Sequence, residues 1–245
     1  MNELRAGLAA VATPTAPTVG RLCVPVVINN RNWLSPVREM VAILQKWEGI
    51  GPIVIIDNDS TYPPLMEWYR TQRAARVVCL PYNMGHAAPF TLQIAYHAMW
   101  RYYVVTDPDL DISRVPGDCL AVLARGLRAN PDVVCAGLSL RVDDIPEDCI
   151  FDRGHIWREE SPNRAAPLVD GFRSAGIDTT FAMYDNWRDG KHDWNVAKPC
   201  IRSDPPYMAR HLPWYLTPDT MTDEARYYFD RADSKSCSSK ARMKC

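Results

Sequence analysis

Residues 101–112, RYYVVTDPDLDI, join an aromatic and β-branched segment directly to three aspartates. Tyr, Val and Thr favour extended structure, so residues 102–107 are predicted to form a strand. Asp107, Asp109 and Asp111 then follow at intervals of two residues. Closely spaced carboxylates repel one another, so something positively charged must neutralise them. What surrounds this strand therefore decides both the fold and the use of the three acids.

Other apolar segments of strand length lie before and after this one, and helical patterns separate them. The predicted strands are 21–29, 52–58, 76–83, 102–107 and 132–140. The predicted helices are 35–47, with Ser35 as N-cap, one after 60–64, one around 91–99 and one over 120–127. Alternation of helices with continuously apolar strands is typical of a mostly parallel sheet covered on both faces. The predicted fold class is therefore α/β, with a mostly parallel sheet flanked by helices.

The middle of the chain is predicted to form one domain. Residues 1–20 are rich in Ala, Thr and Pro and are interpreted as a flexible lead-in, and residues 233–245 as a flexible basic tail. The domain between them spans 21–232, with a first part at about 21–140 and a C-terminal part at about 141–232. In the C-terminal part, only 177–184 is predicted as a clear strand, and helices are short until 222–232.

Composition excludes several classes of function. The 245 residues are 47% apolar and carry a formal net charge of −1, which argues against a nucleic-acid partner bound through a broad basic face. The eight cysteines include no CxxC pair, and several lie in apolar strands as free thiols, which favours a reducing compartment. The N-terminal sequence supports neither a signal peptide nor a transmembrane segment. A soluble, cytoplasmic protein is expected.

Polar residues follow each of the first four predicted strands, in the segments INNRNW, DNDST, PYNMGHAA and TDPDLD. Ligands of parallel sheets bind beyond the carboxyl ends of the strands. A single Asp or Asn there commonly begins a turn or caps a helix, but two of these segments are acidic. Mg²⁺ or Mn²⁺ is the natural counter-charge, since each prefers one or two carboxylates together with substrate phosphates. The pattern therefore predicts a divalent cation and a diphosphate ligand.

A non-catalytic calcium or sugar-binding module is one interpretation of these acids. Asp107, Asp109 and Asp111 match positions 1, 3 and 5 of a calcium loop, and Asp118 falls at position 12. Position 6 is Ile112, where the turn requires Gly. The flanking residues also favour a strand over a helix, so this interpretation is disfavoured.

A second interpretation is a Mg²⁺-dependent phosphatase. The segment VIIDNDST resembles the first motif of haloacid-dehalogenase-like phosphatases, which implies Asp57 as nucleophile and Asp59 as acid/base. That family also uses a Lys to hold the phosphoryl group, and the chain has no Lys between Lys46 and Lys191. The phosphatase stays as the alternative function.

A broader resemblance covers residues 21 to about 184. Their segments VPVVINNRNWL, IVIIDNDST, NMGHAA and VVTDPDLD resemble, in order and spacing, the motifs of GT-A type glycosyltransferases. The chain is similar to the family 2 group and to small viral and bacterial nucleotide-sugar enzymes. The resemblance implies a GT-A, Rossmann-like fold with an elaborated C-terminal acceptor side. It also implies metal-dependent transfer of a sugar from a nucleoside-diphosphate sugar to a hydroxyl of a glycan, glycoprotein or glycolipid.

The same resemblance implies roles for individual residues. Asp109 is expected as the main ligand of Mn²⁺ or Mg²⁺, with Asp107 and His211 as further ligands. The residues expected at the nucleotide sugar are Asn29, Asn30, Arg31, Asp57, Asn83, Gly85 and Asp107. An ionised Asp at a strand end is a suitable acceptor for a base N–H. Asp111 either joins this group or caps the turn that follows it.

An inverting transferase also needs a carboxylate base near the acceptor hydroxyl. Asp178 is the first candidate, because it lies in the predicted late strand, where an unneeded carboxylate would be costly to bury. Asp144 is the alternative candidate. A retaining enzyme would need no such base. Further candidates are the aromatic residues Trp157, Trp194, Trp214 and Tyr215 for the sugar, and Lys191, Lys198 and Arg210 for phosphate.

Overall fold

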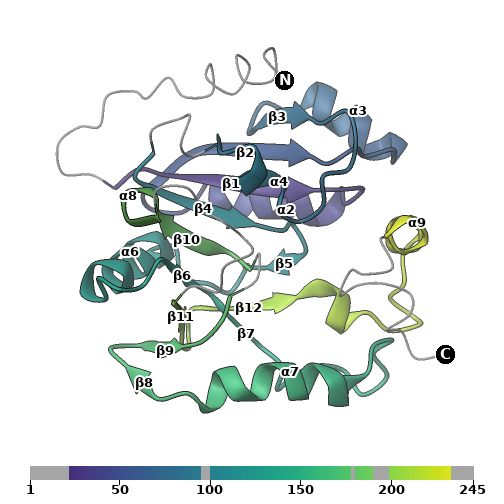
Figure 1. Cartoon of the computed structure of the whole chain (residues 1–245). Helices are drawn as coiled ribbons and strands as arrows, with labels where there is room; N and C mark the ends of the chain where they lie inside the picture. Colours follow the sequence, from purple (N-terminus) through teal and green to yellow (C-terminus); the bar gives the residue numbers. More distant parts are fainter. Residues whose placement is uncertain (1–21, 95–99, 178–179, 190–198, 233–245) are drawn as a thin grey trace.

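The computed structural model describes residues 22–94, 100–177, 180–189 and 199–232, and a nine-stranded sheet forms its centre (Figure 1). Among the described strands of this sheet, only β10 and β9 run against the others. The mostly parallel α/β fold predicted above is therefore confirmed. In spatial order the strands are β3 (Arg76–Cys79), β2 (Ile50–Asp57), β1 (Val24–Asn30), β4 (Tyr102–Thr106), β10 (Ala182–Asp185), β6 (Cys135–Gly137), β11 (Cys200–Ser203), β9 (Phe172–Ser174) and β8 (Leu168–Val169).

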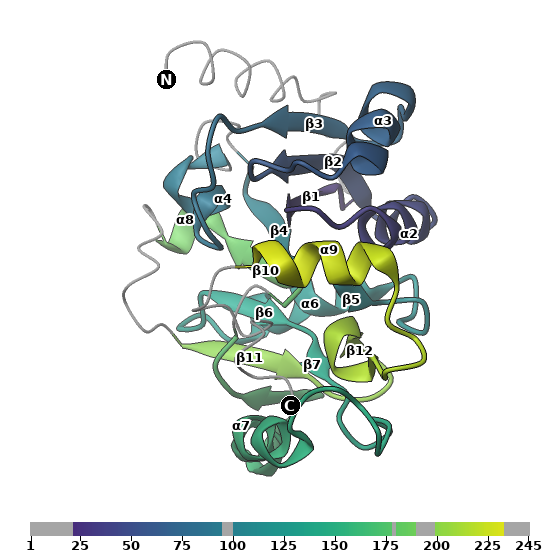
Figure 2. The same cartoon turned by 90° about the vertical axis from the view of Figure 1, so that its right-hand side faces the viewer.

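Helices cover both faces of this sheet, and Figure 2 shows α2 and α3 on one face with α4 and α8 on the other. The helices are α2 (Ser35–Leu44), α3 (Pro63–Thr71), α4 (Ala88–Thr91), α6 (Cys119–Ala129), α7 (Arg153–Ala165), α8 (Asn186–Asp189), the 3₁₀ helix η2 (Leu212–Tyr215) and α9 (Asp223–Arg231). A second sheet has three short strands, in the order β5 (Leu110–Asp111), β12 (Met208–His211) and β7 (Ser139–Leu140).

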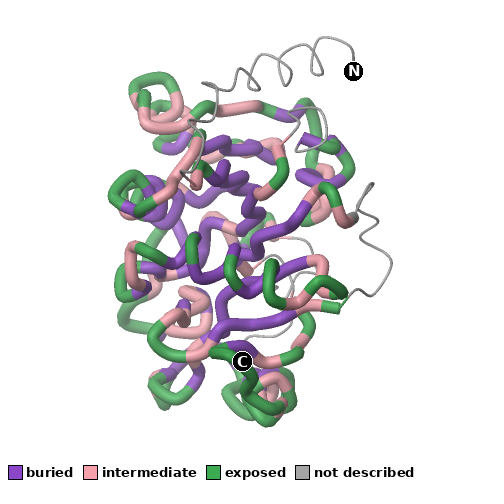
Figure 3. Tube along the Cα trace, turned by 90° about the vertical axis from the view of Figure 1, so that its left-hand side faces the viewer, coloured by how far each residue is buried: buried purple, intermediate pink, exposed green. Residues whose placement is uncertain are grey.

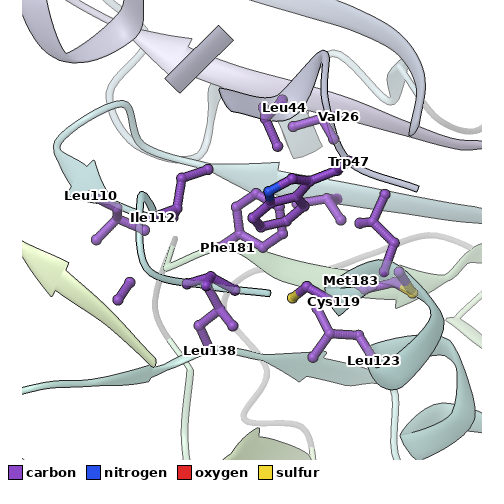
Figure 4. Close-up of a cluster of buried hydrophobic side chains, with 14 of the residues drawn as sticks. Val26, Leu44, Trp47, Leu110, Ile112, Cys119, Leu123, Leu138, Phe181 and Met183 are labelled. Atoms are coloured by element: carbon purple, nitrogen blue, oxygen red, sulfur yellow. The ribbon is translucent and has the colours of Figure 1, made fainter. Parts of the chain in front are cut away.

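The central strands β1, β2 and β4 are buried over most of their length (Figure 3). Their side chains alternate between two hydrophobic clusters. In β1, Val26 and Ile28 belong to the cluster under α2 and α6, whereas Val27 belongs to the cluster on the opposite face. This alternation follows from the two-residue period of a strand. Trp47 and Phe181 meet edge to face in the first cluster, with ring centroids 5.3 Å apart (Figure 4). A sheet buried on both faces leaves its strand ends as the place for polar chemistry.

Gly126 of α6 packs directly against the ring of Phe172 in β9. A Cβ at Gly126 would lie 2.5–2.9 Å from three atoms of that ring. Ala is favoured over Gly in a helix by about 1 kcal/mol, but overpacking a core costs about 1–3 kcal/mol. Because contacts of 2.5–2.9 Å are far too close, the upper part of that overpacking cost, about 2–3 kcal/mol, applies. Gly126→Ala is therefore expected to lower the free energy of unfolding by about 1–2 kcal/mol in urea titrations. Gly117→Ala is the control, because its Cβ would have only Trp47 within reach, at 4.0 Å. Equal stability of the two variants would contradict this packing.

The structure corrects some expected element bounds. Helix α2 begins at Ser35 as predicted, but its N-cap is Leu34 and Ser35 is the first helical residue. Helix α4 precedes the helix expected around 91–99 and overlaps it only at Thr91, whereas Ile94 is again helical and residues 95–99 lie outside the described ones. The strand expected over 177–184 is β10, which ends at Asp185.

The C-terminal part contains more regular structure than predicted. Helix α7 is 13 residues long and was not expected. Strands β8, β9 and β11 were not expected either, and they extend the central sheet beyond β6. Within the described residues, no helix is long and apolar enough to cross a membrane.

Candidate functional site

The carboxyl ends of β1 and β2 bring Asn30 and Asp57 together. The two strands are parallel, and Asn30 is the register partner of Asp57. Both side chains are buried, with relative exposures of 0% and 2%. The sequence therefore places an amide and a carboxylate side by side, at the edge where ligands of parallel sheets bind.

Both carboxylate oxygens of Asp57 accept hydrogen bonds. The Tyr69 hydroxyl donates to Oδ1 and the Ser60 backbone N–H donates to Oδ2, both at 3.1 Å. Burial raises the pKa of the Asp57 carboxyl, and the charge of Asp59 adds to this, while the bonds from Ser60 and Tyr69 act in the opposite direction. A carboxylate has about four lone-pair sites, so Asp57 keeps acceptor capacity for a ligand N–H.

The Asn30 amide joins this group through its nitrogen. Nδ2 donates to the Tyr69 hydroxyl at 2.7 Å and to the Trp33 carbonyl at 3.0 Å. Its Oδ1 is buried and has no partner among the described residues. A buried acceptor without a donor is unfavourable unless a ligand or water supplies one.

Three asparagines gather around Gly85, in the loop after β3. Asn58 Nδ2 donates to the Gly85 carbonyl at 2.7 Å, and the Met84 N–H donates to Asn58 Oδ1 at 2.7 Å. Asn29 Nδ2 reaches the same Gly85 carbonyl at 3.4 Å, and the Gly85 N–H donates to Asn83 Oδ1 at 2.9 Å. Gly85 has φ +75°, a conformation that favours glycine. The structure thus groups Asn29, Asn83 and Gly85, and adds Asn58, which sequence reasoning missed although it follows Asp57 directly.

Arg31 points away from this group. Its Nη1 donates to the carbonyl of Arg231, the last residue of α9, at 2.8 Å. A cation at the carboxyl end of a helix is stabilised by the helix dipole. In this structure Arg31 therefore binds the end of α9.

The first two acids of 107–111 lie at the end of β4 and the start of β5. Asp107 directly follows β4 and is half-buried. Asp109 is 7% exposed, and its carbonyl accepts the Leu212 N–H at 2.8 Å. Its carboxylate Oδ2 lies 3.3 Å from Nε2 of His211. No local pattern predicts this pairing, which joins residues about a hundred positions apart, although the family resemblance implied both residues as metal ligands.

Strand alternation explains why Asp109 and Asp111 face away from the hydrophobic core. Leu110 and Ile112 point into the core (Figure 4) and are 3% and 0% exposed. Their neighbours Asp109 and Asp111 therefore take the opposite side. Ile112 in the core and β5 within a sheet also exclude the calcium-loop geometry for this segment.

Asp111 is paired with an arginine. Its Oδ1 accepts the Ser113 N–H at 2.9 Å, and its Oδ2 lies 3.5 Å from Nη1 of Arg210. Arg210 is the register partner of Asp111 in the β5–β12 ladder and also binds Asp144 through Nε and Nη2. Asp111 therefore caps the turn and neutralises Arg210.

Both carboxylate oxygens of Asp144 have partners. Besides Arg210 it accepts the Tyr215 hydroxyl at 2.7 Å, and Arg141 Nε lies 3.2 Å away. Burial acts to raise the pKa of the Asp144 carboxyl, but the hydrogen bonds from Arg210 and Tyr215 and the charges of both arginines outweigh it and lower the pKa. A carboxylate of low pKa that is held by arginine is a poor proton acceptor.

The structure describes only some of the remaining predicted residues. Asp178 lies outside the described residues, as do Lys191, Trp194 and Lys198. Trp157 is 51% exposed on α7. Trp214 contacts His211, with ring centroids 4.7 Å apart.

The described residues contain no group of three or more His, Cys, Asp or Glu side chains that could hold a metal ion. The pair formed by Asp109 and His211 nevertheless offers one carboxylate oxygen and one imidazole nitrogen 3.3 Å apart. Mg²⁺ and Mn²⁺ complete their coordination with phosphates and waters, so this donor set fits a cation that arrives with a diphosphate.

The phosphatase alternative does not fit this geometry. Asp57 would have to attack phosphorus, but it is 2% exposed and both its oxygens accept hydrogen bonds. Asp59, the expected acid/base, has a left-handed backbone with φ 63° in the turn after β2. The buried carboxylate suits recognition better than nucleophilic attack.

No protein-family model and no curated protein matches the sequence. Solved structures are similar to the chain. A mannosyltransferase from Pyrobaculum calidifontis, in complex with GDP-Man and Mn²⁺, is 16% identical with a TM-score of 0.49, over 85% of this chain and 63% of that one. S. aureus TarS 1–349 is 14% identical with a TM-score of 0.47, over 77% and 60%.

A third similar structure is GalNAc-T7 with UDP, GalNAc and Mn²⁺, at 13% identity and a TM-score of 0.49, over 79% of this chain and 44% of that one. The chain thus spans less than two thirds of the length of these proteins. Likenesses at this level carry no information on substrate.

Proposed function

We propose that the protein is a metal-dependent glycosyltransferase that moves a sugar from a nucleoside-diphosphate sugar to a hydroxyl acceptor. The observation that carries the proposal is a pair of polar groups beyond the carboxyl ends of the parallel strands β1, β2 and β4. One group is the buried pair of Asn30 and Asp57. The other is the carboxylate of Asp109, just after β4, together with the imidazole of His211 in β12. The first suits a nucleobase and ribose, and the second suits a cation with a diphosphate.

The nucleoside would be held by hydrogen bonds from the ends of β1, β2 and β3. Asp57 would accept a base N–H, and the unpartnered Oδ1 of Asn30 would accept a second donor. The loop at Gly85 would bring backbone close to the nucleotide, with Asn29 and Asn83 holding its shape. Arg31 would act indirectly in this arrangement, through its bond to α9.

The cation, Mn²⁺ or Mg²⁺, would be held by Asp109 and His211, with Asp107 as a further ligand. When bound, it acts as a Lewis acid for the departing diphosphate. The residues of this chain orient the donor around it: Asp109 is fixed through its backbone to Leu212, and Trp214 packs against His211. Ligand groups whose orientation is fixed bind without a further ordering cost.

The acceptor would be a hydroxyl of a glycan, glycoprotein or glycolipid. Asp178 is the proposed base for an inverting reaction. Asp144 is the weaker candidate, because its pKa is lowered and its oxygens are bound to Arg210 and Tyr215.

A thermal-shift screen tests the proposal. The full chain is heated with UDP, GDP, dTDP or CDP, each with Mn²⁺, with Mg²⁺ or with EDTA. Stabilisation by at least one nucleoside diphosphate only in the presence of metal is the expected result, since a ligand that binds the folded state raises its stability by RT ln(1 + [L]/Kd). No response to any nucleotide, together with hydrolysis of a generic phosphate ester, would instead favour the phosphatase.

A further inference from the structure

Helix α9 lies over the loops that follow β1 and β2. Figure 1 draws it on the side to which the arrowheads of β1, β2 and β4 point, and Figure 2 looks onto that side. The helix begins after Thr222, whose Oγ1 accepts the Ala225 N–H at 3.1 Å. Its sequence position is far from these loops, so its contacts with them are a tertiary arrangement.

Glu224 of α9 caps the start of α2. Its Oε1 accepts the backbone N–H groups of Leu34 at 2.5 Å and Ser35 at 2.8 Å, and its Oε2 accepts the Ser35 hydroxyl at 2.6 Å. Helix α2 has no side-chain cap from its own N-cap residue Leu34. Glu224 therefore satisfies donors that the first turn of a helix leaves open, and its negative charge suits that end of the helix dipole. It does so from 190 residues away along the chain.

Aromatic side chains of α9 hold both loops. Trp33, in the loop after β1, stacks on Tyr228 with ring centroids 4.4 Å apart. The Tyr227 hydroxyl lies 2.9 Å from the Thr61 carbonyl, in the loop after β2, and its ring packs on Tyr62. Helix α9 thus joins the two loops that directly follow Asn30 of β1 and Asp57 of β2.

A chain of hydrogen bonds continues from Trp33 to the nucleotide site. The Trp33 carbonyl accepts Asn30 Nδ2, the same Nδ2 donates to the Tyr69 hydroxyl, and that hydroxyl donates to Asp57 Oδ1. Asn30 and Asp57 at the two ends of this link are buried, and Tyr69 between them is partly buried. A shift of Trp33 would therefore move the Asn30 side chain and, through Tyr69, change the hydrogen bonding of Asp57.

We propose that α9 positions the nucleotide site, with Glu224 as the positioning residue. This inference rests on the proposed function, since it assigns Glu224 a role in binding the nucleoside part of the donor. Glu224 and Tyr228 fix the loop after β1 before the ligand arrives, so the ligand does not have to order it. Binding the nucleotide and docking α9 then favour one another by the same factor.

The test compares Glu224→Ala and Glu224→Gln with Glu39→Ala, a change at an exposed position of α2, the helix that Glu224 caps. The dissociation constant of the nucleoside diphosphate that stabilises the unaltered protein is measured by titration calorimetry with Mn²⁺. Glu224→Ala is expected to weaken binding about 10-fold, which corresponds to about 1.4 kcal/mol. Glu224→Gln keeps a neutral acceptor and is expected to stay within about threefold, and Glu39→Ala to bind like the unaltered protein.

A second readout separates positioning from stability. Hydrogen exchange of the Leu34 and Ser35 amides is expected to rise in Glu224→Ala, and added nucleotide to reduce it again. Tyr227→Phe keeps the ring and removes only the hydroxyl that binds Thr61. It therefore tests the contact of α9 with the loop after β2 by a change that leaves the packing intact. Unchanged nucleotide affinity in both Glu224→Ala and Tyr227→Phe would overturn this inference and leave the proposed function standing. Failure of the unaltered protein to bind any nucleoside diphosphate would overturn the proposed function and the inference with it.

Discussion

Asp109→Asn is expected to weaken Mn²⁺-dependent binding of a nucleoside diphosphate by about 100-fold or more, about 2.7 kcal/mol. Asn keeps the size of the side chain but removes the charge that would hold the cation, and it leaves His211 as the partner. Mn²⁺ prefers carboxylate oxygen over a neutral amide in such sites. Titration calorimetry with and without Mn²⁺ measures the loss.

The matched control for this variant is Asp111→Asn. Asp111 lies two residues away and is paired with Arg210, so its replacement is expected to reduce stability while nucleotide affinity stays within about threefold. Equal losses of affinity in the two variants would show that the acids do not have the separate roles proposed for them.

Asp57→Asn is expected to lower nucleotide affinity about 10- to 100-fold, because a hydrogen bond to a charged group contributes about 1.5–3 kcal/mol. The same change is expected to stabilise the free protein at neutral pH, since it removes a buried charge whose pKa is raised by burial. Loss of binding together with gain of stability distinguishes a binding residue from a structural one. A variant that loses both would contradict the assignment.

The stability difference between Asp57→Asn and the unaltered protein is expected to grow as pH rises from acid to neutral. Because the pKa of Asp57 is raised in the folded state, the folded chain keeps this proton to higher pH than the unfolded chain does. The contribution of Asp57 to the free energy of unfolding is therefore fully present below the unfolded pKa of about 3.9. It is lost as pH rises through the folded pKa. Urea unfolding of both proteins should show the advantage of Asp57→Asn growing from acid to neutral pH. A constant difference across that range would contradict the buried charge.

The first half of the fold could be predicted from the sequence because its signals are local. Strands β1, β2 and β4 are continuous apolar runs that end in polar residues, and their burial on both faces produces this pattern. The polar ends then meet at one edge because the strands are parallel. The strand-end pattern predicted that the segments containing Asn30 and Asp57 lie at this edge, whereas the roles of the two residues came from the family resemblance and stay predictions.

The C-terminal part could not be predicted in the same way. Helix α7 carries Pro162 in its interior and buries only Ile156 and Glu160 among its described side chains, so it lacks an apolar stripe. Strands β8 and β9 have two and three residues, too few to show a two-residue period. Pairing with neighbouring strands, not local propensity, makes them strands.

The role of Asp111 also depended on tertiary structure. Its spacing from Asp107 and Asp109 suggested a third ligand or a turn cap, and only the β5–β12 ladder reveals Arg210 as its partner. Tyr69 and Glu224 were missed for the same reason, since each acts on residues that the sequence does not place nearby. Tyr69 is separated from Asp57 by a loop and most of α3, and Glu224 lies in another part of the chain.

The central claim is that a cation at Asp109 and His211 joins the protein to a nucleoside diphosphate whose base lies at Asp57. Crystals of the full chain grown with Mn²⁺ and the stabilising nucleoside diphosphate test it directly, because anomalous scattering locates manganese. The expected result is one manganese peak bonded to Asp109, His211 and the diphosphate, with the base hydrogen-bonded to Asp57. Manganese away from this pair, or a nucleotide bound elsewhere on the protein, would contradict the claim.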